Sequence, residues 1–200
     1  MPASRPSLAD YRDKRDPRRT PEPREEGREG DRPCFVIQQH AASSLHYDFR
    51  LEVDGVLKSW AVPKGPSTDP RDKRLAIPTE DHPLAYADFE GVIPEGEYGA
   101  GTVLIWDRGH YRHLKEGDNR SSVAEQLEDG HVSVWLEGTK LRGGYALIRT
   151  RLAQDEGWLL MKMDDEAADA RRNPTSTEPQ SVVTGRTLKE MAAKEEDKPQ

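Results

Sequence analysis

The chain has 200 residues, of which 34% are charged and 34% are apolar, and its formal net charge is −7. This length is enough for one domain of ordinary size, but a chain so rich in charged residues cannot be packed throughout. No apolar run approaches the roughly 20 residues that span a bilayer, and the N-terminus lacks the apolar segment of a signal peptide, so we expect a soluble, cytoplasmic protein with no membrane partner.

The two ends of the chain differ in composition from its middle. Residues 1–32 alternate basic and acidic side chains, carry several prolines and have few apolar residues apart from Leu8 and Tyr11. Residues 164–200 are also highly charged and include a stretch of Ser, Thr and Pro. We therefore expect a flexible charged leader, a single packed domain over residues 33–163, and a disordered charged tail.

The middle of the chain reads as a series of short strands. These segments are rich in Val, Ile, Leu, Trp and Tyr, and Gly or Pro separates most of them. The expected strands cover residues 34–39, 45–53, 57–62, 73–77, 102–107, 131–136, 145–150 and 158–163. Asp54-Gly55 predicts a type I′ hairpin turn between the second and third strands.

One clear helix interrupts the strands. Ser122 and Glu125 have the spacing of a capping box, and the helix is expected to end by Gly130. About eight strands in one domain indicate a barrel or a sandwich. We expect a mainly β fold in the form of a compact closed barrel, with one or two short outer helices.

The second expected strand carries the most chemistry. Alternation places His46, Asp48, Arg50 and Glu52 on one face of the strand and apolar residues on the other. If His40 folds back through the turn between the first two strands, two imidazoles and one carboxylate form a ligand set suited to zinc, manganese or iron. Arg50 would then present its guanidinium to an oxyanion on that metal, which indicates phosphate chemistry. The alternative is a half-exposed strand whose polar face meets solvent.

Two further segments are candidates to complete this site. His82 precedes Pro83, which favours an extended loop over a helix. The adjacent Glu80 and Asp81 are expected to raise the pKa of His82, which would suit a phosphate donor or general acid; the alternative is an exposed loop histidine. The glycine-rich run at residues 94–101 lacks the ending of a phosphate-binding loop and predicts a structural turn.

Several longer motifs occur together in one order. They are Phe35 to His40, Leu45 to Glu52, Leu57 to Gly65, Glu80 to Pro83, Phe89 to Gly91, Ile93 to Gly99, Gly138 to Leu141 and Trp158 to Lys162. Together these motifs resemble the 3′-phosphoesterase domain of bacterial DNA ligase D, over essentially the whole expected core. Because no segment resembles the ligase or polymerase parts of that family, we expect a stand-alone version of the domain.

The resemblance implies a manganese-dependent enzyme that heals DNA 3′ ends for non-homologous end joining, with Zn2+ or Co2+ as other candidate metals. Such an enzyme removes a 3′ ribonucleoside as a phosphodiesterase and then the 3′-phosphate as a phosphomonoesterase, leaving a 3′-hydroxyl. By motif, the metal ligands fall on His40, His46 and Asp48, and the phosphate-binding residues fall on Arg50, His82 and Tyr86, with Lys64 and Arg74 as weaker candidates.

The resemblance also assigns supporting residues. Gln38 would orient a ligand imidazole through its amide, since metal-bound histidines usually have such a partner. The leader resembles that of the family at Lys14-Arg15-Asp16 and at Thr20-Pro21-Glu22-Pro23, and its charged residues would contribute to activity although they lie outside the packed core.

The resemblance names DNA or RNA/DNA 3′ ends at primer-template junctions as the partner, with a separate DNA ligase or end-joining protein as a second candidate. We expect a monomer in the cytoplasm, associated with the nucleoid. The net charge of −7 predicts weak, salt-sensitive DNA binding, because phosphate neutralisation supplies most nonspecific affinity. Two alternatives stay open: a hydrolase of small phosphodiesters or nucleotides, and a noncatalytic module that binds DNA ends.

Overall fold

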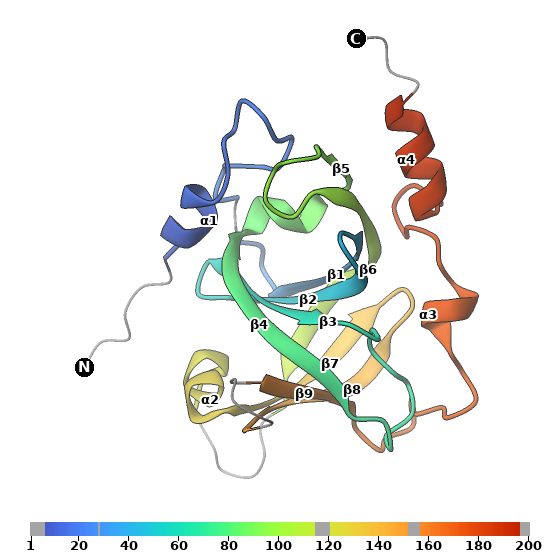
Figure 1. Cartoon of the computed structure of the whole chain (residues 1–200). Helices are drawn as coiled ribbons and strands as arrows, with labels where there is room; N and C mark the ends of the chain where they lie inside the picture. The colour runs from blue at the N-terminus through green and yellow to red at the C-terminus, as the bar shows by residue number, and fades with distance from the viewer. Residues whose placement is uncertain (1–6, 28, 115–120, 152–156, 197–200) are drawn as a thin grey trace.

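The computed structural model describes residues 7–27, 29–114, 121–151 and 157–196. These residues form nine strands (Figure 1). They are β1 (Cys34–Ala41), β2 (Leu45–Val53), β3 (Val56–Val62), β4 (Arg74–Pro83), β5 (Gly91–Ile93), β6 (Gly101–His113), β7 (His131–Gly138), β8 (Arg142–Thr150) and β9 (Gly157–Lys162).

Eight of the nine strands close into an antiparallel barrel. Hydrogen bonding runs in the order β1-β2-β3-β4-β9-β8-β7-β6, and β6 pairs with β1 to complete the ring. The long β6 has β1 along one edge, while its other edge pairs first with β5 and then with β7. β5 therefore lies outside the ring. The prediction of a mainly β, closed barrel of about eight strands is confirmed.

The β2–β3 hairpin has the turn that the sequence predicts. Asp54 and Gly55 both have positive φ angles, +49° and +82°, as a type I′ turn requires. This turn fixes the register at Val53 opposite Val56, and so fixes which face each β2 side chain occupies.

Apolar side chains fill the inside of the barrel. Phe49 and Leu51 of β2, Trp60 of β3 and Trp106 of β6 belong to one buried cluster, and each is at most 4% exposed. Fully burying one such side chain stabilises the fold by about 1.5–3 kcal/mol. Because residues alternate along β2, its polar residues point out of the barrel. The chemistry of β2 is thus on the outer wall.

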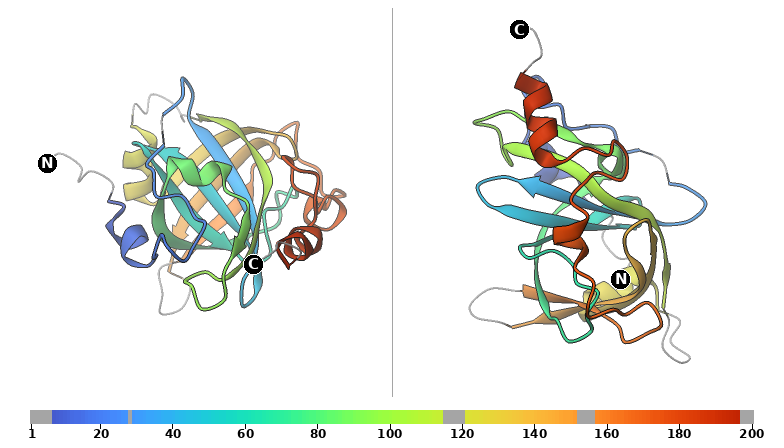
Figure 2. Two further views of the ribbon diagram at one scale, coloured as in Figure 1. Left: turned by 90° about the horizontal axis from the view of Figure 1, so that it is seen from above. Right: turned by 90° about the vertical axis from the view of Figure 1, so that its right-hand side faces the viewer.

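A second apolar cluster covers part of this outer wall. It joins Val36 of β1 and Ile105 of β6 to Tyr86 on the 3-10 helix η1 (Leu84–Asp88), and to Tyr11 on α1 (Ala9–Asp13). Seen from above, η1 and the N-terminal segment lie over the strands (Figure 2, left). These elements and β5 cover one patch of the outer wall. From here on we call them the roof.

Helix α2 (Val123–Asp129) is the helix that the sequence predicts. Ser122 and Glu125 form a complete capping box, and Gly130 ends the helix with a φ of +87°. The side chains of Val123, Ala124 and Leu127 pack against the cluster inside the barrel. The helix therefore covers apolar surface at the barrel and presents its polar side to solvent.

The flanking segments lie closer to the barrel than we expected for loosely attached ends. Tyr11 is 2% exposed, and its hydroxyl donates to the carbonyl of Pro23. At the other end, α3 (Pro174–Thr177) and α4 (Leu188–Glu196) follow one side of the barrel (Figure 2, right). The domain boundaries at 33 and 163 stay a prediction, and the first six and last four residues of the chain lie outside the described part.

Several strands are longer than expected, among them β6, and the extension of β4 changes the placement of a site residue. The sequence predicts a strand over 73–77 and a loop at His82, but β4 continues to Pro83, so His82 lies on a strand. The β3–β4 ladder shifts register between Leu57 and Ser59, and this irregularity lets β4 continue to its terminal proline. Among the described residues, no helix combines the length and apolar composition needed to cross a membrane.

Candidate metal and phosphate site

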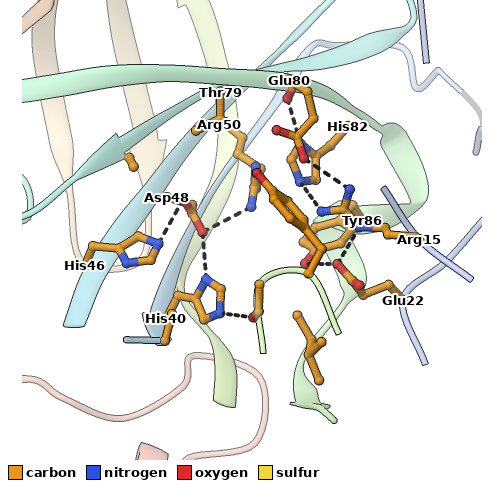
Figure 3. A pocket seen from close by; sticks show the side chains of 15 residues that line it. Arg15, Glu22, His40, His46, Asp48, Arg50, Thr79, Glu80, His82 and Tyr86 are labelled. Atoms are coloured by element: carbon orange, nitrogen blue, oxygen red, sulfur yellow. Dashed lines mark hydrogen bonds and ion pairs between the residues drawn. The ribbon is translucent and has the colours of Figure 1, made fainter. Parts of the chain in front are cut away.

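The β1–β2 hairpin brings the three expected metal ligands together on the outer wall (Figure 3). The ladder places His40 directly opposite His46, with their ring centroids 4.8 Å apart. Asp48 follows two positions later on the same face of β2. One potential ligand atom from each of the three residues can be chosen so that all lie within 4.8 Å of one another. His40 therefore folds back onto β2, as the predicted ligand set required.

Backbone carbonyls determine which nitrogen of each imidazole is free. His40 Nε2 lies 2.7 Å from the carbonyl oxygen of Gly99, and His46 Nδ1 lies 3.1 Å from that of Ser44. Because a carbonyl oxygen only accepts, each of these nitrogens carries the proton. In the neutral rings, the lone pairs are then on His40 Nδ1 and His46 Nε2, each 3.5 Å from an oxygen of Asp48.

This convergence fits a divalent cation. Two nitrogen lone pairs and a carboxylate facing one another repel unless positive charge lies between them, and borderline metals prefer such a ligand set. The hydrogen bond to Asp48 raises the pKa of His46, although burial opposes the shift. Burial would raise the pKa of the Asp48 carboxyl, but Arg50 and the two imidazoles outweigh it and hold that pKa well below its usual range. The site therefore attracts positive charge.

Arg50 lies beside the ligands with one nitrogen uncommitted. Its Nη2 is 3.2 Å from Asp48 Oδ2 and its Nε donates to Gln38 Oε1 at 2.7 Å. Its Nη1 is buried and has no hydrogen-bond partner among the described residues. A buried N–H without an acceptor costs about 1–3 kcal/mol, so this atom is a ready donor to an anion that enters the site.

Gln38 has a different role from the one expected. Its amide nitrogen donates to the carbonyls of Tyr86 and Phe89, both at 2.9 Å, and its oxygen accepts from Arg50. The amide therefore orients the guanidinium of Arg50 and ties β1 to η1, and it does not hold a ligand imidazole. The expectation was wrong because the side chain is directed toward the neighbouring strand and the roof.

His82 is also different from the expectation, because its pKa is lowered well below its usual value. Burial is the largest cause, followed by the charges of Arg50 and Arg15. The two neighbouring acids do not offset this, since Glu80 pairs with Arg15 and Asp81 pairs with Lys58. His82 Nδ1 donates to the carbonyl of Glu80 at 2.8 Å, which leaves a lone pair on Nε2. In this neutral state His82 can act as a base at Nε2 but not as a general acid.

The roof adds residues that the strand pattern did not show. Arg15 forms ion pairs with Glu22 at 2.8 Å and with Glu80 at 3.1 Å, and all three side chains are less than 10% exposed. Its Nη2 is 3.5 Å from His82 Nε2. The resemblance pointed to the leader at residues 14–16 and 20–23, which include Arg15 and Glu22, but composition alone gave no sign that this segment would reach the site.

Tyr86 belongs to this network and lies in front of Arg50. Its hydroxyl donates to Glu22 Oε1 at 2.9 Å, and its ring is 4.9 Å from the Arg50 guanidinium. Burial and the charge of Glu22 raise the pKa of Tyr86 well above its usual value, so the hydroxyl keeps its proton. Tyr86 thus holds Arg50 in place from the roof side, with its hydroxyl directed to the leader.

A cavity of about 250 Å³ connects these groups. Its walls include Arg15, Glu22, His40, His46, Asp48, Arg50, Thr79, Glu80, His82, Tyr86 and Tyr98. Lys64 and Arg74, the weaker phosphate candidates, do not line it. Lys64 is an exposed residue in the turn after β3, and Arg74 is at the start of β4, 3.3 Å from Asp72.

The glycine-rich turn at residues 94–101 does more than change the chain direction. It delivers the Gly99 carbonyl to His40, and Gly99 has a φ of +74°, a conformation that L side chains rarely adopt. The sequence predicts the turn, but its hydrogen bond to a ligand histidine depends on the tertiary structure.

Comparison with known proteins places this geometry in context. The model of the DNA ligase D 3′-phosphoesterase domain family matches residues 38–149. A multifunctional non-homologous end joining protein LigD from Pseudomonas aeruginosa is 50% identical over 196 residues, covering 94% of this chain and 22% of that protein.

Two mycobacterial relatives match in the same way. The LigD proteins of Mycobacterium tuberculosis and Mycolicibacterium smegmatis are 48% identical over 161 residues and 46% identical over 166 residues, and each match covers 80% of this chain. The chain spans about a fifth of the length of these curated relatives.

Proposed function

The chain belongs to the DNA ligase D 3′-phosphoesterase domain family, and from this premise we propose that it is a manganese-dependent phosphoesterase that heals DNA 3′ ends. It would remove a terminal 3′ ribonucleoside and then the 3′-phosphate, leaving a 3′-hydroxyl for end joining. The observation that carries this proposal is the convergence of three ligand atoms beside the uncommitted Nη1 of Arg50 in one cavity.

His40, His46 and Asp48 would hold the metal through His40 Nδ1, His46 Nε2 and a carboxylate oxygen. A divalent ion bound there would polarise the phosphorus and lower the pKa of a water molecule. The carbonyls of Gly99 and Ser44 hold the two imidazoles in the ligating tautomers. The two imidazole lone pairs would therefore face the metal position already in the metal-free protein.

Arg50 would bind a nonbridging phosphate oxygen through Nη1. Gln38 and Asp48 hold the other two guanidinium nitrogens. The guanidinium group therefore does not need to reorient as negative charge develops on the phosphate. A guanidinium held at two nitrogens keeps its third nitrogen in position to donate to a phosphate oxygen.

His82 would take up a proton when the phosphate binds. Its low pKa reflects burial and the positive charges of Arg50 and Arg15, and a phosphate dianion beside these arginines offsets their effect. His82 Nε2 could then donate to a phosphate oxygen or to the leaving oxygen. Arg15, 3.5 Å from the same nitrogen, holds the ring between the roof and the strands.

The test is the processing of a 5′-labelled primer-template that ends in one ribonucleotide. With Mn2+, the parent protein is expected to give first a 3′-phosphate end and then a 3′-hydroxyl, whereas His46→Ala gives neither. His110→Ala is the matched control, because His110 is an exposed histidine on β6 outside the cavity. Parallel reactions with Zn2+, Co2+ and a chelator identify the metal.

Two results would contradict the proposal. Hydrolysis of free nucleotides or a chromogenic diester without action on the primer end would indicate a small-substrate hydrolase. Tight binding of 3′ ends without turnover in any metal would indicate a noncatalytic end-binding module.

A further inference from the structure

An exposed aromatic side chain lies at the phosphate cavity. Tyr98 lines the same cavity as Arg50, yet it is 48% exposed. In the described part of the chain, the other large apolar side chains with high exposure are aliphatic. Leaving the apolar surface of a large ring in water is unfavourable. The ring of Tyr98 is thus a candidate contact for the rest of a molecule whose phosphate enters the cavity.

The turn that carries Tyr98 is fixed to the leader and to a metal ligand. It follows β5, and seen from above it lies beside the β1–β2 hairpin (Figure 2, left). The residue before Tyr98, Glu97, pairs with Arg19 of the leader at 2.8 Å. The carbonyl of the residue after it, Gly99, lies 2.7 Å from His40 Nε2. Tyr98 is therefore held close to the proposed metal position by contacts of both its neighbours.

The leader contacts the hydroxyl end of this ring. Lys14 Nζ lies 3.5 Å from the Tyr98 hydroxyl oxygen and 4.8 Å from the ring centroid, so it is nearer to the hydroxyl than to the centre of the ring. The guanidinium carbon of Arg15 is 5.2 Å from the same centroid. These contacts place positive charge beside the ring and leave about half of the Tyr98 side chain open to solvent.

The glutamates that line the cavity are paired, so they do not exclude a nucleotide. Glu22 pairs with Arg15, and Glu80 pairs with both Arg15 and Lys14. A nucleobase is neutral and is not repelled by these pairs. The side chain of Lys14 is also 41% exposed, which leaves it accessible to a phosphate of the same strand. The surroundings of Tyr98 therefore suit a nucleotide better than an isolated aromatic ligand.

We propose that Tyr98 stacks on the nucleobase of the nucleotide whose 3′ oxygen carries the phosphate held by Arg50. This inference rests on the proposed function, because it assumes that the phosphate belongs to a nucleic-acid end. Tyr98 and Arg50 line one cavity on the outer wall of the barrel, so the base and the phosphate of a single nucleotide can reach both. Stacking on an aromatic ring is tolerant of sequence, which suits the processing of ends of any sequence.

The test compares two 5′-labelled single-stranded oligonucleotides that both end in a 3′-phosphate. One has a normal terminal nucleotide, and the other has an abasic terminal residue. Their affinities for the full chain are measured by fluorescence anisotropy in a chelator, so that metal-dependent hydrolysis does not consume them. The parent is expected to bind the abasic oligonucleotide about 5-fold to 150-fold more weakly, the range for the loss of one stacked base.

Two variants separate the ring of Tyr98 from its hydroxyl. Tyr98→Leu removes the flat ring, and it is expected to bind the normal oligonucleotide as weakly as the parent binds the abasic one, with abasic binding unchanged. Tyr98→Phe removes only the hydroxyl that contacts Lys14, and it is expected to keep the preference of the parent. Val183→Leu is the control, because Val183 is 47% exposed and does not line the cavity.

Equal binding of both oligonucleotides by the parent would overturn the inference, and so would a preference for the base that survives Tyr98→Leu. An equal loss of affinity for both oligonucleotides in Tyr98→Leu would also overturn it, because Tyr98 would then only support the leader. Hydrolysis in Mn2+ is scored separately. Turnover with equal binding would refute the inference and leave the proposed function standing. Base-dependent binding that is lost in Tyr98→Leu, without turnover by the parent, would support the inference and contradict the proposed enzyme.

Discussion

At the scale of single residues, Arg50 shows how the site is prepared for an anion. Two of its nitrogens are held by Asp48 and Gln38, and the third is buried without a partner among the described residues. Lysine in this position could keep a positive charge but could not hold these neighbours and a phosphate at the same time. The geometry of the guanidinium therefore matters as much as its charge.

We accordingly expect Arg50→Lys to lower kcat on a 3′-phosphate oligonucleotide by about 10²–10³, the usual effect of losing one fixed donor to a transition-state oxygen. Arg112→Lys is the matched control, since Arg112 is an exposed arginine on β6. A loss below tenfold in single-turnover rates at saturating Mn2+ would mean that Arg50 does not contact the reacting phosphate.

His82 gives a prediction about stability and pH. Its pKa in the folded protein is well below the unfolded value of 6.5, so the folded state binds fewer protons. The contribution of His82 to the free energy of unfolding is therefore complete above pH 6.5. It is lost as the pH falls toward the pKa of His82 in the folded protein. Between pH 7.5 and 5.5 the free energy of unfolding of the parent is therefore expected to fall by more than that of His82→Gln.

Urea unfolding of both proteins at the two pH values, in a chelator, measures this difference. His46 has a raised pKa and responds in the opposite direction, but it is present in both proteins, so its effect cancels. Parallel pH dependence of parent and variant would show that the pKa of His82 is the same in the folded and unfolded states.

At the scale of elements, the leader, η1 and β5 form the roof over the site. Arg15 pairs with Glu22 within the leader and with Glu80 on β4, so one guanidinium connects the roof to the barrel. The Tyr86 hydroxyl on η1 adds a third contact through Glu22. The position of the roof thus depends on buried charges that only remain favourable while they are paired.

Arg15→Gln is therefore expected to lower the free energy of unfolding by about 3 kcal/mol, because it removes the only ion-pair partner of buried Glu22 among the described residues and leaves Glu80 with the partly exposed Lys14 alone. Arg18→Gln is the matched control: its side chain is 86% exposed, and a change within about 0.5 kcal/mol is expected. Chemical denaturation measures both. Equal, small effects would mean that the leader detaches from the barrel at little cost.

At the scale of the whole molecule, charge limits how DNA can bind. The net charge is −7, so a broad electrostatic attraction to a duplex is absent and contacts are confined to the phosphates near the site. We expect the logarithm of the affinity for a single-stranded 3′-phosphate end to fall with the logarithm of salt concentration with a slope of about −1 to −2, as for two or three neutralised phosphates. A slope steeper than about −4 in a salt titration would require a second basic surface.

Sequence reasoning reached the parts of the molecule that local patterns encode. Alternation along β2 predicts that His46, Asp48 and Arg50 share a face, and the Asp54-Gly55 turn predicts the next hairpin. These features depend on residues within one or two strands. The same is true of the capping box of α2.

The remaining features depend on contacts between distant residues. The sequence neighbours of His82 are acids, but burial and, after it, the nearby Arg50 and Arg15 lower its pKa, opposite to the expected direction. Composition predicts a flexible leader, yet its few apolar residues include Tyr11, whose ring packs against the rings of both His82 and Tyr86. A single buried aromatic residue cannot be recognised from average composition.

The placement of the site on the outer wall has a consequence for engineering. β2 directs Phe49 and Leu51 into the barrel and Asp48 and Arg50 out of it, so support and reactivity occupy opposite sides of the same strand. Interior side chains can be exchanged for others of equal volume without touching a reacting group. A single-residue insertion within β2, by contrast, would invert both sides at once. The barrel should therefore tolerate substitutions of its interior side chains but not changes in the length of β2.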